Sequence, residues 1–290
     1  LPFIQMAEWI GAYGLSFFMV LSVALFFVTI WDISRKVYHG WFHGLFYISL
    51  FLALFFGLLS KGYFLLQEPT SEKLIRVGIV QGNIPQEIKW NEELKGKIVE
   101  KYTKLSELLL YDRPDMVVWP EASYPGFLLN DLTTSGVGQL IEKSKVPYLI
   151  GSPRYDYSNG NLYNSAIWLN EKGEVEGAYD KRNLVPYGEY VPFKKILFFL
   201  EKLAYSMGVG DFSHGKSWQV FQGPLGFKFA SLVCFENVFP SMTSEFAKRG
   251  AEFFVVITND AWFQKSRAPY EHLYTSIFRA IETRRPFVHA

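Results

Sequence analysis

The sequence predicts an α/β domain that follows two transmembrane helices, and two observations favour this fold class. The first 60 residues contain two long apolar runs without Asp, Glu, Lys or Arg. The rest of the chain alternates short apolar segments with amphipathic ones, which is typical of layered α/β folds. The formal net charge is only +1. Because this charge gives no strong field toward nucleic acid, no nucleic-acid partner is expected.

The two apolar runs cover residues 10–31 and 41–60. Each holds about 20 residues, which at about 1.5 Å per residue matches the roughly 30 Å hydrocarbon core of a bilayer. Trp9, Trp31 and Trp41 stand at their ends, as aromatic residues do at membrane interfaces. Neither a basic segment nor a small-residue cleavage site indicates a signal peptide. A hairpin of buried core helices is the alternative, and the run length argues against it.

The loop between the two runs sets the expected orientation. It carries Arg35 and Lys36 against Asp32, so the positive-inside rule places it in the cytoplasm. The chain that leaves the second run after Ser60 would then lie on the outer side of the membrane.

We therefore expect three parts in the chain: residues 1–62 with the membrane helices, a linker at 63–73 and an extracytoplasmic domain at 74–290. The chain begins with Leu1 instead of Met and stops within a strand-like run. We expect from these ends that the sequence is a piece of a longer protein, truncated on both sides.

The outer domain contains strand and helix patterns in alternation. Short apolar runs predict strands at 74–81, 115–120, 146–151, 226–234 and 252–259. Residues 163–170 and 173–180 flank a Lys-Gly turn and predict a hairpin. Apolar residues at helical spacing predict helices at 91–110, 137–145, 242–250 and 270–285.

Three titratable residues stand at the carboxyl ends of predicted strands, where ligand sites of α/β sheets gather. They are Glu121, Lys181 and Cys234, and Cys234 is the only cysteine of the chain. A thiolate is the reactive form of cysteine, and a nearby cation lowers the thiol pKa. A carboxylate can take the thiol proton, and the lysine can hold an oxyanion together with a backbone N–H near Phe235.

Each of these residues also has an ordinary explanation. A lone cysteine is usually a small buried hydrophobe, and Glu121 and Lys181 could be solvated charges after a strand. Glu189 and Glu236 could likewise be ordinary solvated charges. Composition and periodicity permit the catalytic set without establishing it. A single cysteine excludes an internal disulfide, and no Cys/His pair has zinc-ligand spacing, so we expect no metal and no cofactor.

Several motifs carry a resemblance to a known family. "VWPEAS", "YDKRNLVPYGEYVP", "LVCFENVFP" and "TNDAWF" occur in this order and resemble the carbon–nitrogen hydrolase (nitrilase) superfamily, which uses a Glu–Lys–Cys triad. With "VQGNIPQEIKW" and the membrane helices, they resemble its membrane-embedded branch, the apolipoprotein N-acyltransferases. The resemblance covers nearly the whole chain. It implies a nitrilase-type αββα sandwich in a multi-pass protein of the bacterial inner membrane, with the catalytic domain on the periplasmic side.

The resemblance also implies the roles of single residues. Cys234 would be the nucleophile, Glu121 the general base and Lys181 the oxyanion stabiliser. Glu189 would hold Lys181 and the attacking amine in place. The remaining roles are pocket support by Glu236, an aromatic ring after the nucleophile at Phe235, and a lipid-facing entrance shaped by Trp90 and Trp262. For the two tryptophans, ordinary packing is the alternative.

The implied reaction has two acyl transfers. Cys234 would take a fatty acyl chain from a phospholipid as a thioester, and the α-amino group of a diacylglyceryl-cysteine on an apolipoprotein would then accept it. The expected partners are thus a phospholipid, the apolipoprotein and the membrane, and a monomer suffices. Two alternatives remain open: a membrane-tethered amidase with the same triad, and a non-catalytic relative that binds lipid or lipoprotein.

Residues 193–212 form an apolar face flanked by lysines. This pattern predicts an amphipathic lid that dips into the membrane interface. A buried core helix is the alternative.

Overall fold

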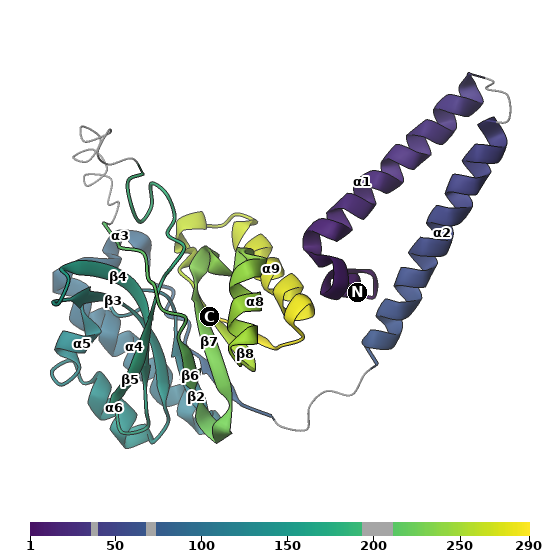
Figure 1. Ribbon diagram of the computed structural model, residues 1–290. Coiled ribbons are helices and arrows are strands. Elements are labelled where there is room, and N and C mark those ends of the chain that lie inside the picture. Colours follow the sequence, from purple (N-terminus) through teal and green to yellow (C-terminus); the bar gives the residue numbers. More distant parts are fainter. Residues whose placement is uncertain (36–39, 68–73, 193–210) are drawn as a thin grey trace. The chain divides into compact units, whose positions relative to one another are not determined.

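The computed structural model describes residues 1–35, 40–67, 74–192 and 211–290 (Figure 1). Most of the predicted lid, at 193–210, lies outside the described residues. The chain divides into two compact units. One comprises Leu1–Lys73 with Ile277–Arg284, and the other comprises Leu74–Ser276 with Arg285–Ala290.

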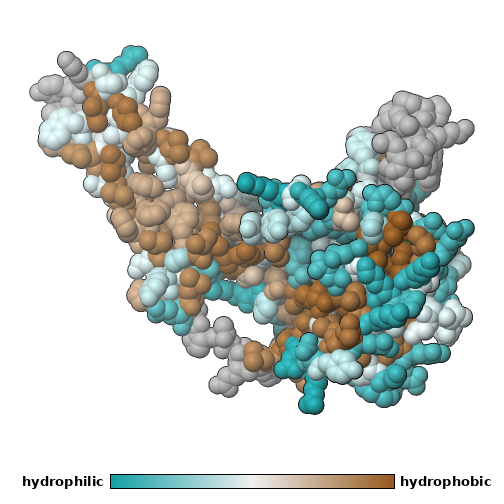
Figure 2. Space-filling model, turned by 180° about the vertical axis from the view of Figure 1, so that it is seen from behind, coloured by the Kyte–Doolittle hydropathy of each residue, from teal (hydrophilic) through white to brown (hydrophobic). Residues whose placement is uncertain are grey.

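The first unit contains a short 3-10 helix, η1 (Phe3–Met6), and the long helices α1 (Ala7–Ser34) and α2 (Gly40–Leu65). Among the described residues, these are two helices long and apolar enough to cross a membrane. Only 11% and 6% of their most apolar windows is buried, which differs from the buried core helices considered as the alternative. Figure 2 shows that the surface of these helices is largely hydrophobic.

Two mixed β-sheets form the second unit. The first has the order β1-β2-β3-β4-β5, in which β1 to β3 are parallel and β4 and β5 continue as antiparallel hairpins. Its strands are β1 (Val77–Ile79), β2 (Met116–Trp119), β3 (Tyr148–Asp156), β4 (Asn161–Leu169) and β5 (Val175–Asp180). The second has the order β6-β7-β8-β9, with only β6 antiparallel. Its strands are β6 (Val220–Gln222), β7 (Lys228–Val233), β8 (Phe253–Ile257) and β9 (Phe287–His289).

The longer helices after α2 lie close to where periodicity predicted them. They are α4 (Lys95–Leu109), α6 (Val137–Ser144), α8 (Pro240–Lys248) and α9 (Ala268–Thr283). From Ile277 onward, α9 belongs to the first unit. Short helical turns connect the elements: α3 (Gln86–Lys89), η2 (Glu92–Leu94), η3 (Leu110–Asp112), α5 (Leu128–Asp131), η4 (Pro224–Gly226), η5 (Cys234–Val238) and η6 (Asp260–Phe263).

Strand β2 shows how the layers pack. Val118 packs in one core cluster with Leu232 of the second sheet, and Trp119 packs on the opposite face with residues of α4 and α6 such as Tyr102 and Ile141. The two sheets therefore face each other, with α4 and α6 outside the first sheet (Figure 1). Since both faces of such strands are buried, they are apolar throughout, as their sequence runs suggested.

Candidate active site

Glu121 lies in a turn directly after β2. A Cβ atom at Gly151 of β3 would lie 2.7 Å from the Glu121 Cα, so only glycine lets β3 pass this close to the turn. The Glu121 carboxylate accepts a hydrogen bond from the Asn259 backbone N–H at 2.9 Å and another from Asn164 Nδ2 at 2.7 Å. The side chain is buried and held from two directions, unlike a solvated loop residue.

Lys181 follows β5 and is 1% exposed. Its Nζ lies 2.9 Å from the Glu189 carboxylate and 3.6 Å from Glu121 Oε1. Burial alone would lower the pKa of Lys181, but the negative charges of Glu121, Cys234 and Glu189 outweigh burial and raise it. The side chain therefore stays an ammonium ion between two carboxylates.

Asn164 of β4 links the two carboxylates, and sequence reasoning missed it. Its Nδ2 donates to Glu121 at 2.7 Å and to Glu189 at 2.8 Å. Glu189 also accepts from the Val185 backbone N–H at 2.8 Å. A buried asparagine within the apolar strand "LYNSAIW" was a signal for this role, because such an amide needs polar partners.

Cys234 begins η5 one residue after β7 ends, so the prediction that it completes the strand is wrong. Its φ of 52° lies in the left-handed region, which cannot continue a strand and costs a non-glycine residue about 1–3 kcal/mol. Burial and the negative charge of Glu121 raise the pKa of Cys234 to about 12, although Lys181 acts in the opposite direction. Lys181 therefore lowers the pKa of the Cys234 thiol as expected, but the opposite effect of burial is larger.

Glu236 is fully buried and joins the two turns that carry Lys181 and Cys234. Its carboxylate accepts from the Arg182 and Asn183 backbone N–H groups at 2.8 and 3.0 Å. It also accepts from the Val233 N–H and the Tyr179 hydroxyl, each at 2.9 Å. These bonds favour the carboxylate, but burial outweighs them and raises the pKa of Glu236. Glu236 thus fixes the spacing of the turns.

Replacing Glu236 by glutamine should destabilise the fold. One carboxylate oxygen becomes an NH₂ group, so at least one buried donor loses its acceptor, at about 1–3 kcal/mol. Urea unfolding measures this difference. Glu100→Gln is the matched control, because Glu100 forms only an exposed i,i+4 pair with Lys104, and exposed pairs contribute little to stability. Equal losses in the two variants would contradict the role of Glu236.

A cavity of about 470 Å³ opens beside the paired carboxylates. Its lining includes Glu121, Glu189 and Asn164 together with Trp90 and Trp262. Trp90 is 50% exposed and Trp262 is 62% exposed, so both side chains stand at the surface of the cavity and do not fill the core. Lys181 and Cys234 are not among its lining residues.

The aromatic residue after the nucleophile is Phe235, which is exposed, with its ring 6.2 Å from that of Phe239. It lies outside the core and adds apolar surface next to Cys234. Like the two tryptophans, it stands where an apolar ligand can reach it.

Lys89 is a second buried lysine at the site, and sequence reasoning missed it. It is 4% exposed, and its Nζ donates to the Glu121 carbonyl oxygen at 3.0 Å. Burial lowers the pKa of Lys89 to about 8, against the opposing effects of the charges on Glu121 and Cys234. Its position in "QEIKW", directly before Trp90, was the available signal.

The stability of the protein should depend on pH through Lys89. Above pH 8 the folded protein releases the Lys89 proton, whereas the unfolded chain keeps it up to about pH 10.5. The folded state then binds fewer protons, so stability rises with pH in this window. Relative to Lys89→Met, the free energy of unfolding should increase by about 2 kcal/mol between pH 7.5 and 9.5. Urea unfolding at both pH values tests this, and parallel curves for the two proteins would contradict it.

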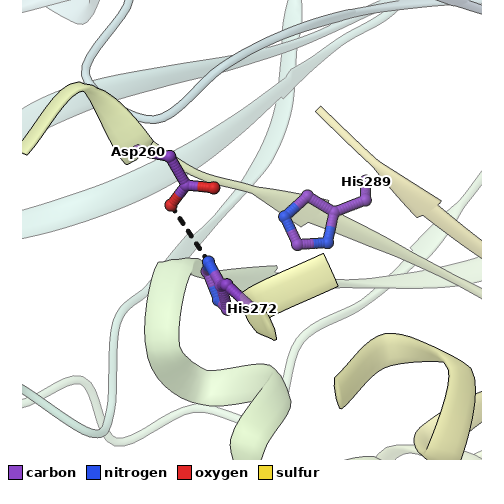
Figure 3. A group of neighbouring side chains, drawn as sticks. All are labelled: Asp260, His272 and His289. Carbon is purple, nitrogen blue, oxygen red and sulfur yellow. Dashed lines mark hydrogen bonds and ion pairs between the residues drawn. The ribbon is translucent and has the colours of Figure 1, made fainter. Parts of the chain in front are cut away.

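A group of ionisable side chains contacts the nucleophile turn through His272, whose Nε2 lies 3.2 Å from the Cys234 carbonyl oxygen. Asp260, His272 and His289 each offer one atom, and these atoms lie within 4.8 Å of one another (Figure 3). His272 Nδ1 lies 3.0 Å from Asp260 Oδ1. Sequence reasoning did not indicate this group, because its histidines are widely spaced along the chain.

Comparison with known proteins shows which family and which curated proteins the chain resembles. A family described as carbon–nitrogen hydrolase matches residues 76–290. The apolipoprotein N-acyltransferase of Geobacter metallireducens is 36% identical over 294 residues, which cover 100% of this chain and 56% of that protein. The protein of the same name from Aquifex aeolicus is 35% identical over 218 residues, covering 74% and 47%. The chain thus spans about half the length of these curated relatives.

Solved structures resemble about three quarters of the chain in fold. Saccharomyces cerevisiae Nit3, a member of branch 10 of the nitrilase superfamily, has a TM-score of 0.54 at 16% identity, covering 76% of this chain and 78% of its own. A carbon–nitrogen hydrolase from Helicobacter pylori has a TM-score of 0.55 at 18% identity, covering 74% and 72%. The predicted nitrilase-type fold is confirmed.

Proposed function

Since this chain belongs to the carbon–nitrogen hydrolase family, we propose that it transfers a fatty acyl chain from a phospholipid to the diacylglyceryl-cysteine amine of apolipoproteins. One observation carries the proposal: the buried Glu121–Lys181 ion pair and the only cysteine follow strands of two facing sheets, in a chain with two membrane-length helices. The names of the relatives agree with this activity.

In the first half-reaction, Glu121 takes the proton of the Cys234 thiol. A base is needed because a thiol with a pKa of about 12 is protonated at neutral pH. The sulfur attacks the ester carbonyl carbon of the phospholipid, and the developing oxyanion is stabilised by Lys181. The ester bond breaks, Glu121 returns the proton to the leaving alkoxide, and a lysophospholipid departs from the thioester.

In the second half-reaction, the α-amino group of the apolipoprotein attacks the thioester carbon. Glu121 accepts a proton from the amine, the C–S bond breaks, and the sulfur leaves to regain a proton as the free thiol. Glu189 holds Lys181 in place and offers its carboxylate to the incoming amine. The acyl chain is bound covalently to the enzyme after the first product leaves and before the second substrate reacts, so the kinetics should be ping-pong.

Both substrates are lipids, and the proposed entrance suits them. Trp90 and Trp262 present apolar surface at the cavity, and Phe235 exposes apolar surface directly after Cys234. We place the catalytic domain, residues 74–290, outside the cytoplasm of a bacterial inner membrane, joined by a linker at 63–73 to the two helices. The basic loop between the helices supports this orientation.

Mass spectrometry of the 290-residue chain in dipalmitoyl phospholipid vesicles tests the proposal. We expect one palmitoyl group on Cys234, which disappears when a diacylglyceryl-cysteine peptide is added and reappears on the amine of that peptide. Hydrolysis of a small amide without any lipid adduct would favour the amidase. Lipid binding with an unmodified Cys234 would indicate a non-catalytic relative. Either of the last two results overturns the proposal.

A further inference from the structure

We propose that His272 is a positioning residue that holds the nucleophile turn as a doubly protonated imidazolium, donating one N–H to Asp260 and the other to the Cys234 carbonyl oxygen and the Asn237 side chain. His272 lies on α9 and is buried. The proposal concerns the nucleophile assigned above, but it makes a claim about protonation that does not depend on which acyl group is transferred.

The first step is the orientation of Asn237. Its Nδ2 lies 3.2 Å from the His272 carbonyl oxygen and 2.9 Å from Ser276 Oγ. A backbone carbonyl can only accept, so the NH₂ group of Asn237 must face it. The amide oxygen of Asn237 consequently points to the His272 ring, at 2.9 Å from Nε2.

The second step is the proton count on the ring. Nε2 faces the Asn237 oxygen and, at 3.2 Å, the Cys234 carbonyl oxygen, so Nε2 must carry a proton. Nδ1 faces a carboxylate oxygen of Asp260 at 3.0 Å, so a donor is needed there too. Within the described part of the chain, both nitrogens therefore face acceptors when Asp260 is a carboxylate, and only the imidazolium supplies a proton to each of them.

The surrounding charges fit this state. Asp260 faces Nδ1, and its Oδ1 also accepts from the Thr258 hydroxyl at 3.0 Å. The ring of His289 on β9 lies 5.0 Å from that of His272. Burial and the positive charge of His272 lower the pKa of His289 to about 4, although Asp260 acts against them. His289 is therefore the neutral member of the pair, and one cation is balanced by one carboxylate.

The consequence concerns Cys234, whose left-handed φ needs support. A charged donor on its carbonyl oxygen holds the turn more strongly than a neutral donor would. The same positive charge favours the thiolate, in addition to the charge of Lys181. Loss of this charge should therefore make the thiol harder to ionise.

The first test measures the protonation of the His272 ring directly. Nitrogen NMR of the full chain with labelled histidine should show both His272 nitrogens protonated at pH 7, assigned by the signal that His272→Gln loses. An unprotonated Nδ1 or Nε2 would overturn the proposal. A signal of metal-bound nitrogen that a chelator abolishes would overturn it as well, because Asp260, His272 and His289 would then form a metal site (Figure 3).

The second test uses the single cysteine. Iodoacetamide modifies only Cys234, and its rate reports the thiolate fraction. At pH 8, His272→Gln should react about three- to tenfold more slowly than the unmodified sequence, since glutamine keeps a donor but not the charge. His43→Gln, the same change in α2, should react at the original rate. An unchanged rate in folded His272→Gln contradicts the proposal, and this outcome is independent of whether acyl transfer occurs.

Discussion

Replacing Cys234 by serine is expected to abolish acyl transfer, with a loss of about 10⁴-fold or more. A serine hydroxyl is far less acidic than a thiol, so the Glu121 carboxylate cannot generate enough nucleophile from it. The measurement is transfer of a labelled acyl chain from phospholipid vesicles to a diacylglyceryl-cysteine peptide. In the same samples, the lipid adduct at position 234 should be absent from the intact protein mass.

Two controls separate loss of chemistry from loss of fold. The free energy of unfolding of the serine variant, measured with urea, should lie within about 1 kcal/mol of that of the original sequence, because the two side chains have similar size. Iodoacetamide should inactivate the original sequence and leave the residual activity of the serine variant unchanged, since the chain has no other cysteine. Transfer by the serine variant at a rate near the original would refute the nucleophilic role.

The sequence predicted the layers of the fold well because they depend on local patterns. Val118 and Leu232 belong to apolar runs that are buried on both faces, and such runs identify strands without knowledge of their neighbours. The same holds for the membrane-length helices, whose length and composition are local properties. Glu121 and Lys181 were found because they directly follow such strands.

The missed residues act through contacts between distant segments. Asn164 meets Glu121 across 43 residues, Lys89 meets it across 32, and His272 meets the Cys234 carbonyl across 38. Periodicity tells which face of an element a residue occupies, but not which side chain of another element it meets there. The strand pattern indicated Glu121, Lys181 and Cys234, and the family resemblance added supporting residues such as Glu189 and Glu236. Neither indicated the contacts of Asn164, Lys89 and His272.

The backbone conformation of Cys234 is a second feature that the local sequence could not predict. The apolar run of β7 continues into the cysteine, so periodicity extended the strand by one residue. The left-handed φ of Cys234 is maintained by partners from elsewhere, such as Glu236, which accepts from Val233, and His272. Strain of this kind is stabilised by the surrounding fold and cannot be inferred from the local sequence.

Replacing Lys181 by methionine is expected to damage both activity and stability. Removal of the ammonium group leaves Glu121 and Glu189 facing each other without a cation, at a site where Lys181 was 1% exposed. Loss of one partner from a buried ion pair costs about 3–5 kcal/mol. Loss of the oxyanion stabiliser should reduce acyl transfer by about 10²–10³-fold.

A double variant separates the two effects of Lys181. Lys181→Met combined with Glu189→Gln removes one negative charge along with the positive one, so it should recover part of the lost unfolding free energy. It should not recover acyl transfer, because neither replacement can stabilise an oxyanion as the ammonium does. Lys172→Met, at an exposed turn, is the matched control and should change neither quantity. Acyl transfer that returns together with stability would mean that Lys181 serves only to hold the fold, because its catalytic charge would then be dispensable.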